Sequence, residues 1–153
     1  MNTLCDSLLI KDVRLQLKAA DHHDALEEIL SLLRSDVRVR DWEDLRSTLL
    51  ANSLNETFRK TPSAMFLHHC RTESVSDLVL AAGRSVSGIL MPGCEEKIHL
   101  IFLAAIPEAL NNEYLRILGA ISRICSEPET MQKLLDFENT SEFLALLERG
   151  CRS

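Results

Sequence analysis

The sequence predicts an α/β (α+β) fold in which a mixed β-sheet is flanked by helices on both faces. The order of the elements is the first reason, because helical patterns come first, extended segments follow, and helical patterns return after Pro107. The second reason is segment 97–106, which is apolar on both faces and therefore predicts a central strand covered on both sides. A length of 153 residues suits one domain, so we expect a single domain over residues 1–153.

Composition and charge argue against several classes of protein. The chain is 46% hydrophobic and 26% charged, which is typical of a soluble globular protein. The net charge is −6 and no run of basic residues exceeds two, so we expect no nucleic-acid binding. The apolar stretch 98–107 is far shorter than a membrane span, which predicts no membrane insertion. The five cysteines are widely spaced, which favours reduced thiols over disulfides or structural zinc. A cytoplasmic location is expected because the cysteine pattern suggests reduced thiols.

The first third of the chain predicts a strand and two helices. Segment 9–19 alternates apolar with polar residues and reads as a strand. Asp21 is expected to cap a helix in which His22 and His23 occupy the solvated first turn, and Asp41 to cap a second helix that ends near residue 52. The segment 53–63 is polar and is expected to be mostly loop. The first helix carries apolar residues at helical spacing: Ala25, Leu26, Ile29, Leu30 and Leu33.

Three further strands are expected at 64–70, 77–85 and 97–106. Gly88, Pro92 and Gly93 predict a turn or excursion between the last two. His99 lies inside the central strand, and we interpret it as a hydrogen-bonded or rim histidine rather than a functional one.

Three helices are expected after the strands. The first has Asn111 or Asn112 as its cap and an apolar stripe that includes Tyr114. The second begins at a capping box, 126–129, with proline in its first turn. The same signature at 139–142 begins the last helix.

The segment AMFLHHCR, residues 64–71, holds the chemically interesting side chains. Because neighbouring side chains of a strand point to opposite faces, His68 and His69 cannot both face one site. Adjacent residues of an extended chain also chelate a metal poorly, so we expect no metal site here. One interpretation is that one histidine is exposed and the other is hydrogen-bonded in the sheet. The other is that a neutral imidazole at a strand end attacks phosphorus and forms phosphohistidine.

The chain resembles a known family from this segment onward. The stretch FLHHCR is similar to the A-h-P-H-[GAC]-R segment of bacterial phosphotransferase-system enzyme IIA domains of the fructose/mannitol and nitrogen-regulatory type. The stretches SDLVLAAGRSVSGILM, KIHLIFLAAIPEALNNEYLRILGAISRIC and TSEFLALLERG resemble its following strands and helices. The resemblance covers about residues 64–149 without a gap, and it implies the IIA fructose/mannitol-type fold.

The resemblance implies a phosphoryl carrier whose phosphorylated residue is His69. Arg71 would contact the phosphate, and Tyr114 falls where the family has a second histidine, from which it could donate a phenolic hydrogen bond. A surface arginine and a core tyrosine are the structural alternatives for these two residues. The implied partners are a histidine-containing phosphocarrier protein and a IIB component or regulatory proteins. No cofactor is implied, and both sugar uptake and nitrogen regulation are implied roles.

The sequence also departs from the family pattern. The usual proline before the active histidine is His68, and the upstream arginine–glutamate and Ser/Thr-Gly motifs are not recognisable near Asn52, Ser53 and 58–63. These departures leave a second hypothesis open, a degenerate IIA-like interaction module that is not phosphorylated. A third hypothesis is an unrelated hydrolase that uses Cys70 or His69.

Overall fold

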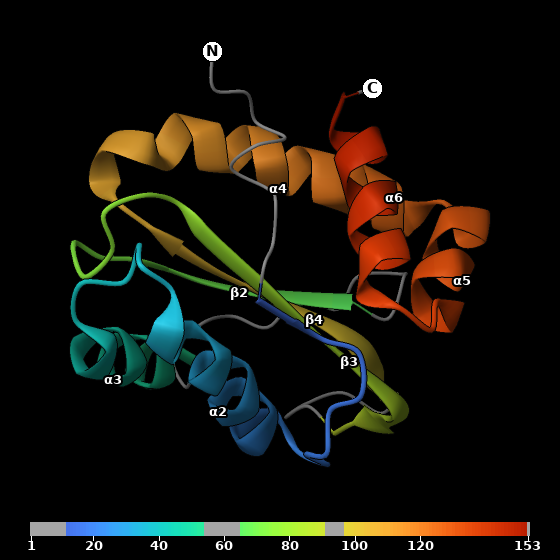
Figure 1. Cartoon of the computed structure of the whole chain (residues 1–153), viewed down its shortest axis with the longest axis horizontal. Coiled ribbons are helices and arrows are strands. Elements are labelled where there is room, and N and C mark those ends of the chain that lie inside the picture. Colours follow the sequence, from blue (N-terminus) through green and yellow to red (C-terminus); the bar gives the residue numbers. More distant parts are fainter. Residues whose placement is uncertain (1–11, 54–64, 91–96, 153) are drawn as a thin grey trace.

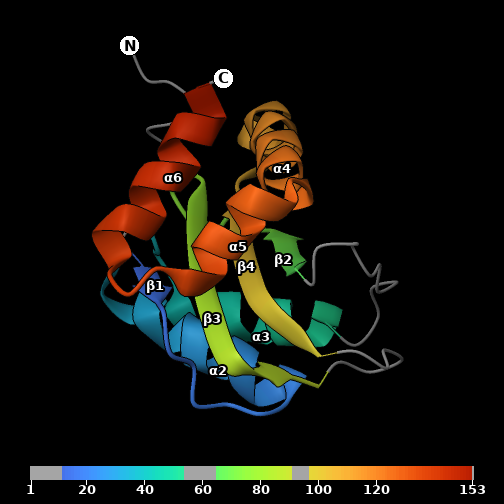
Figure 2. The ribbon, with the colours of Figure 1, turned by 90° about the vertical axis from the view of Figure 1, so that its right-hand side faces the viewer.

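The computed structural model describes residues 12–53, 65–90 and 97–152 and contains a four-stranded mixed sheet in the order β1-β3-β4-β2. Strand β1 pairs parallel with β3, β3 pairs antiparallel with β4, and β4 pairs parallel with β2. Figures 1 and 2 show this sheet between two layers of helices, which confirms the predicted fold class. The strands are β1 (Asp12–Arg14), β2 (Met65–Arg71), β3 (Val79–Ile89) and β4 (Ile98–Ile106).

The helices divide between the two faces of the sheet. One face carries the helices that precede β2, and the other carries those that follow β4 (Figure 1). The first group is α2 (His22–Leu32), the short 3-10 helix Leu33–Ser35 and α3 (Trp42–Ser53). The second group is the 3-10 helix Glu108–Leu110, α4 (Asn111–Ser126), α5 (Pro128–Asp136) and α6 (Thr140–Arg152).

Strand β4 is the central strand that its sequence predicts. Every residue of it except the half-buried His99 is buried. Its side chains alternate between the two layers, so that Phe102 packs under α4–α6 while Leu103 packs against α2 and α3. Strand β4 therefore contributes side chains to both hydrophobic cores, and its pairing with β2 fixes the position of one strand end relative to the other.

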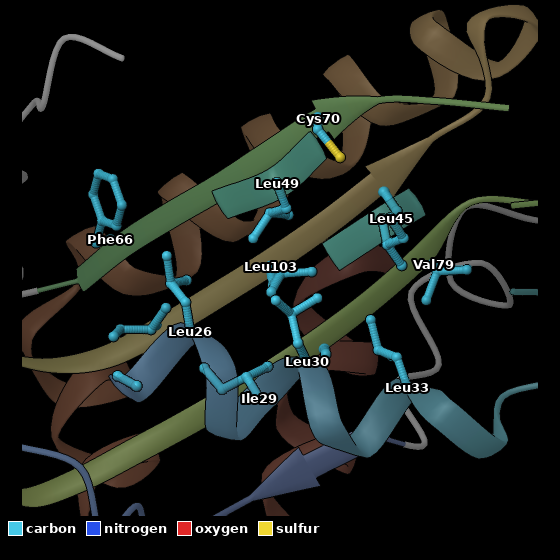
Figure 3. Packing of buried hydrophobic residues seen from close by; sticks show 14 of the residues in the cluster. Leu26, Ile29, Leu30, Leu33, Leu45, Leu49, Phe66, Cys70, Val79 and Leu103 are labelled. Atoms are coloured by element: carbon cyan, nitrogen blue, oxygen red, sulfur yellow. The ribbon is translucent and has the colours of Figure 1, made fainter. Parts of the chain in front are cut away.

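The layer beneath the sheet is built by the apolar stripe of α2 (Figure 3). Leu26, Ile29 and Leu30 project from α2 toward the sheet. At β3 the helix comes so close that a Cβ on Gly83 would lie 2.8 Å from Ile29 and Leu17 side-chain atoms. Glycine at this position allows the helix to pack directly on the strand.

Several predicted helix caps are confirmed. The Asp21 carboxylate accepts a hydrogen bond from the Asp24 amide at 2.9 Å, and the Asp41 carboxylate accepts one from the Asp44 amide at 3.0 Å. At the last helix, Asn139 Oδ1 accepts from the Glu142 amide at 2.9 Å. In each case a short polar side chain satisfies an amide of the first turn that has no partner within the helix.

Two predicted caps are wrong. Helix α4 begins at Asn111, but no side chain caps it, because the 3-10 helix before it continues into it and the Asn111 side chain binds Arg71 instead. Helix α5 is likewise uncapped, because Ser126 belongs to the end of α4, where its hydroxyl donates to the Ser122 carbonyl. The proline prediction holds, since Pro128 is in the first turn of α5.

Strand boundaries differ from expectation at two places. Of the strand expected at 9–19, residues 9–11 lie outside the described residues, and the strand ends at Arg14. Beyond it the Glu28 carboxylate accepts the amides of Lys18 and Ala19 and holds this segment against α2. Strand β3 extends to Ile89 through an irregularity in which Gly88 has φ +94°. The expected loop at 53–63 and the turn near Pro92 lie largely or wholly outside the described residues.

Candidate functional site

Strand β2 directs its two histidines to opposite faces of the sheet, as predicted. Met65 and Leu67 pack on the α4–α6 side, and Phe66 and Cys70 pack on the α2–α3 side. His69 lies on the same face as the first pair and contacts the ring of Tyr114 on α4. His68 lies on the same face as the second pair and contacts the ring of His22 on α2. The two imidazoles therefore belong to different sites.

His69 lies at the carboxyl end of β2, beside the amino end of α4. Its ring centroid is 5.5 Å from that of Tyr114, and the ring planes are inclined by 37°. The imidazole is half-buried, and its partner residue on β4 is the small Ala104. Tyr114 is only 2% exposed and belongs to the core above the sheet. The structure thus brings the two predicted site residues together and places Tyr114 as one wall of the site.

Arg71 ends β2 and is tied to the same end of α4. Its Nε donates a hydrogen bond to Asn111 Oδ1 at 3.0 Å. The side chain remains exposed, and its cationic guanidinium is held at the edge of the site. Asn111, which sequence reasoning proposed only as a cap, is therefore a residue that orients the predicted phosphate-contacting arginine.

His68 forms a buried pair with His22. The two Nε2 atoms are 2.9 Å apart, and His68 and His22 are 1% and 8% exposed. The ring centroids are 5.0 Å apart, so the rings meet at their Nε2 atoms rather than face to face. The expectation that His22 is solvated is wrong. Its place on the buried stripe, at helical spacing with Ala25, Leu26 and Ile29, is the signal that predicts burial.

Burial keeps this pair uncharged near neutral pH. Desolvation, with a smaller contribution from the neighbouring histidines, lowers the pKa of His68 to about 3. Desolvation also lowers the pKa of His22. A hydrogen bond between two imidazole nitrogens needs one N–H donor and one bare nitrogen, and only the neutral pair offers that combination without adding a charge. His69 therefore has an uncharged residue before it in the chain.

The other candidate groups lie apart from His69. The Cys70 side chain is 2% exposed within the hydrophobic layer on the α2–α3 side, so it shares no site with His69. His99 Nδ1 is 2.9 Å from the Ser85 carbonyl oxygen, and it is hydrogen-bonded as expected. Among the described residues, no group of three or more His, Cys, Asp or Glu side chains is arranged to hold a metal ion. The upstream positions 58–63 lie outside the described residues, and the side chains of Asn52 and Ser53 are not described.

Comparison with known sequences identifies relatives along nearly the whole chain. Residues 7–150 match the family model "Phosphoenolpyruvate-dependent sugar phosphotransferase system, EIIA 2". The fructose-specific EIIA component of Haloferax volcanii is 28% identical over 128 residues, which are 83% of this chain and 82% of that protein. The fructose-specific EIIABC component of Bacillus subtilis is 21% identical over 138 residues, 90% of this chain. The chain spans 22% of that longer protein.

Solved structures share the fold. The nitrogen regulatory protein IIA-Ntr from Neisseria meningitidis has a TM-score of 0.81 at 18% identity, covering 92% of this chain and 97% of that one. A chain in the complex of enzyme IIAMTL and phosphorylated enzyme IIBMTL from Escherichia coli has a TM-score of 0.73 at 16% identity, covering 89% and 93%.

The family match begins at residue 7, well before the segment 64–71 that resembles the family in sequence. It includes α2 and α3, which resemble the family only in outline at the level of sequence. In the described part of the chain, no helix has both the length and the apolar character needed to cross a membrane. The family model matches nearly the whole chain and solved structures share its fold, so the chain belongs to the EIIA 2 family of the phosphoenolpyruvate-dependent sugar phosphotransferase system.

Proposed function

We propose that this protein is a phosphoryl carrier that accepts a phosphoryl group on His69. The observation that carries the proposal is the environment of that imidazole, which is half-buried, reaches the surface beside Arg71, and is backed by Tyr114. The other histidine of the pair, His68, is sealed in the core and bound to His22. Of these two histidines in β2, only His69 offers a ring that another protein can reach.

The proposed reaction moves a phosphoryl group between two imidazoles. A ring nitrogen of His69 bonds to phosphorus as the nitrogen–phosphorus bond of the donor breaks, and one proton passes from His69 to the donor imidazole. Arg71 neutralises charge on the phosphoryl oxygens, and Tyr114 donates a hydrogen bond from its hydroxyl. The fold contributes the positioning of these groups, which is the main requirement of phosphoryl transfer.

The family suggests the partners. We infer a histidine-containing phosphocarrier protein as donor and a IIB component as acceptor, in the cytoplasm. A structural relative occurs in a complex with a phosphorylated IIB enzyme, which supports the second partner. Relatives of both the fructose-specific and the nitrogen-regulatory kind are similar to this chain, so sugar uptake and regulation are both roles to test.

The test is phosphorylation from phosphoenolpyruvate in the presence of enzyme I and the cognate phosphocarrier protein. We expect an acid-labile label that His69→Ala abolishes. His23→Ala is the matched control, because His23 is exposed on α2 and should leave labelling unchanged. A wild-type chain that takes up no label, or label that survives in His69→Ala, contradicts the proposal.

The role of Arg71 has its own test. Arg71→Gln removes the cation and should slow phosphorylation by about tenfold or more, since a charge-assisted hydrogen bond to phosphate is lost. Arg116→Gln removes an exposed arginine from α4 and should have no comparable effect. Equal rates for the two variants would assign Arg71 to the surface only.

The second candidate function is a IIA-like interaction module that is not phosphorylated. The burial of Tyr114, where the family has a second histidine, favours it, because a core tyrosine can replace that histidine without serving the phosphate. This hypothesis predicts that His69→Ala and His69→Asp retain the same partners as the wild type in a pull-down. Detection of phosphohistidine at position 69 in cells would contradict it.

A further inference from the structure

A buried arginine lies at the opposite end of the sheet from His69. Arg84 of β3 is 6% exposed, and its Nε and Nη1 donate to the carbonyl oxygens of Leu15 and Leu134 at 3.1 and 3.0 Å. Within the part of the chain that the structure describes, Arg84 forms no ion pair. A buried cation without a directly bound counter-charge is unfavourable, and burial accordingly lowers the pKa of this guanidinium, although the charge of Asp136 partly opposes that shift.

The arginine borders a pocket. The pocket has a volume of about 260 Å³ and is lined by residues of β3, β4 and the end of α5. Those residues are Arg84, Ser85, Val86, His99, Leu135 and Asp136. Arg84 pairs with Leu100 and His69 pairs with Ala104, so the pocket and the phosphorylation site occupy different ends of β4. About 17 Å of strand separates residue 99 from residue 104.

The polar groups of this pocket are complementary to a small ligand of mixed character. Arg84 supplies a guanidinium whose Nη2 takes part in neither of the two carbonyl bonds. The Asp136 carboxylate lies on the exposed side and accepts a hydrogen bond from Gln132 Nε2 at 3.0 Å. His99 Nδ1 must donate to the Ser85 carbonyl, because a carbonyl only accepts, and its Nε2 is the other ring nitrogen that a ligand can bind.

We propose that this pocket binds a small carboxylate that carries an adjacent amine or hydroxyl group, of the α-amino or α-hydroxy acid class. The carboxylate pairs with the guanidinium of Arg84, whose planar fork suits two parallel hydrogen bonds. Asp136 accepts a hydrogen bond from the amine or hydroxyl, and its negative charge disfavours dianions such as phosphate. The pocket volume suits a metabolite of a few heavy atoms rather than a nucleotide or a peptide.

A purely structural role for Arg84 is the alternative. Its two bonds tie the segment after β1 and the last turn of α5 to β3, and a helix carboxyl end partly offsets a positive charge. In that role Asp136 is only a neighbouring charge, His99 has no part, and no ligand is predicted. The two explanations therefore differ in what Asp136 does, and Asp136 is exposed, so its replacement by asparagine leaves the core intact.

The experiment is a nuclear magnetic resonance titration of the full chain with L-alanine, L-lactate, acetate and inorganic phosphate. We expect saturable amide shifts at Ser85, His99 and Asp136 with alanine or lactate, and binding of acetate and phosphate at least about tenfold weaker. The relative response to alanine and lactate decides between an amine and a hydroxyl on the ligand. Asp136→Asn should remove the preference over acetate, because the charge that selects the second group is gone. The exposed Arg123→Gln, in the groove between α4 and α6, should change nothing.

The readout does not depend on phosphorylation, so it can fail or succeed separately from the proposed function. Absence of saturable shifts with every compound overturns the site. Shifts confined to Arg71 and Asn111 overturn it as well, because they assign anion binding to the phosphorylation site. Equal binding of acetate and alanine, unchanged in Asp136→Asn, overturns the proposed ligand class.

Discussion

The neighbouring histidines of β2 have opposite environments, and we propose that His69 is reactive whereas His68 is structural. His69 reaches the surface near Arg71, which is the proposed contact of an incoming phosphoryl group. His68 is held in the core by a hydrogen bond to His22 and is covered at its edge by Phe66, at 4.7 Å between ring centroids. The buried pair joins α2 to β2 at the residue immediately before His69, so it anchors the strand end that carries His69.

Tyr114 provides a prediction for the site itself. Tyr114→Phe removes only the hydroxyl and keeps the packed ring, so the fold should be unchanged. If the hydroxyl binds a phosphoryl oxygen, losing one hydrogen bond of about 1 kcal/mol slows phosphorylation by roughly fivefold. Single-turnover labelling by the phosphocarrier protein measures the rate, and thermal unfolding checks the stability. An unaltered rate would assign Tyr114 to the core alone.

The buried histidine pair makes stability sensitive to acid. The pKa of His68 is 6.5 when unfolded and about 3 when folded, so below pH 6.5 the unfolded chain binds protons that the folded chain refuses. Stability from this source is therefore present above pH 6.5 and is lost as the pH falls toward 3. Between pH 7 and pH 4.5 the loss from His68 alone is about 2–3 kcal/mol.

Urea unfolding of the wild type and of His22→Leu/His68→Leu at pH 7 and pH 4.5 measures this effect. Carboxylate titration is common to both proteins and cancels in the comparison. We expect the double variant to lose less stability on acidification than the wild type. Identical losses would mean that the pair takes up protons in the folded state as readily as in the unfolded one.

At the level of whole elements, the sequence predicts best where the signal is local. Asp21 and Asp41 cap the helices that they precede. The apolar residues on both faces of β4 predict its central position in the sheet. The alternation of side chains along a strand is equally local, and it is enough to assign His68 and His69 to opposite faces of the sheet.

Features that depend on distant partners could not be predicted in this way. Asn111 carries a cap signature, but Arg71, forty positions earlier in the chain, engages its oxygen in another bond. The partner of His22 is similarly set by tertiary packing, although helical spacing indicates that His22 is buried. Sequence patterns thus locate the candidate site, and only the packing of α4 and α2 on β2 shows how it is built.

Two glycines, Gly83 at the contact between α2 and β3 and Gly119 on α4, should respond in opposite ways to replacement by alanine. Gly83→Ala places a Cβ 2.8 Å from Ile29 and Leu17, so the helix or the side chains must shift, which should cost about 1–3 kcal/mol. Gly119→Ala lies in α4 with no atom within 4 Å of the new Cβ, and it should stabilise by about 1 kcal/mol. Chemical unfolding measures both. A neutral Gly83→Ala would show that the packing of α2 on β3 is looser than described.

For the molecule as a whole, the sheet is the frame that relates the two sites. The proposed phosphorylation site and the proposed carboxylate pocket are supported by opposite ends of β4, and both lie on the face covered by α4–α6. Occupancy of one leaves the other sterically open. Any influence between them has to pass through the strands and the core that they share.

Amide hydrogen exchange should show that the central strand of the sheet is more strongly protected than its edge strand β1. The β4 amides lie between two partner strands with both faces covered, so they should exchange only through global unfolding. In the described residues, strand β1 spans Asp12–Arg14 and pairs with β3 alone, so its amides should exchange through local opening. Mass spectrometry of exchanged peptides compares the two. Equal protection of β1 and β4 would contradict this order.

The pairing of the strands also governs when a growing chain can acquire this shape. Strands β1 and β2 leave the ribosome before β3 and β4, yet in the described structure each pairs only with one of those later strands. Strand β1 and α2 therefore lack their partner strand until β3, which ends at Ile89, has been made, and β2 lacks its partner until β4, which ends at Ile106, has been made. We expect nascent chains that end before β4 to expose apolar residues of α2 that the complete sheet covers, and exposed apolar surface of this kind favours aggregation and chaperone binding.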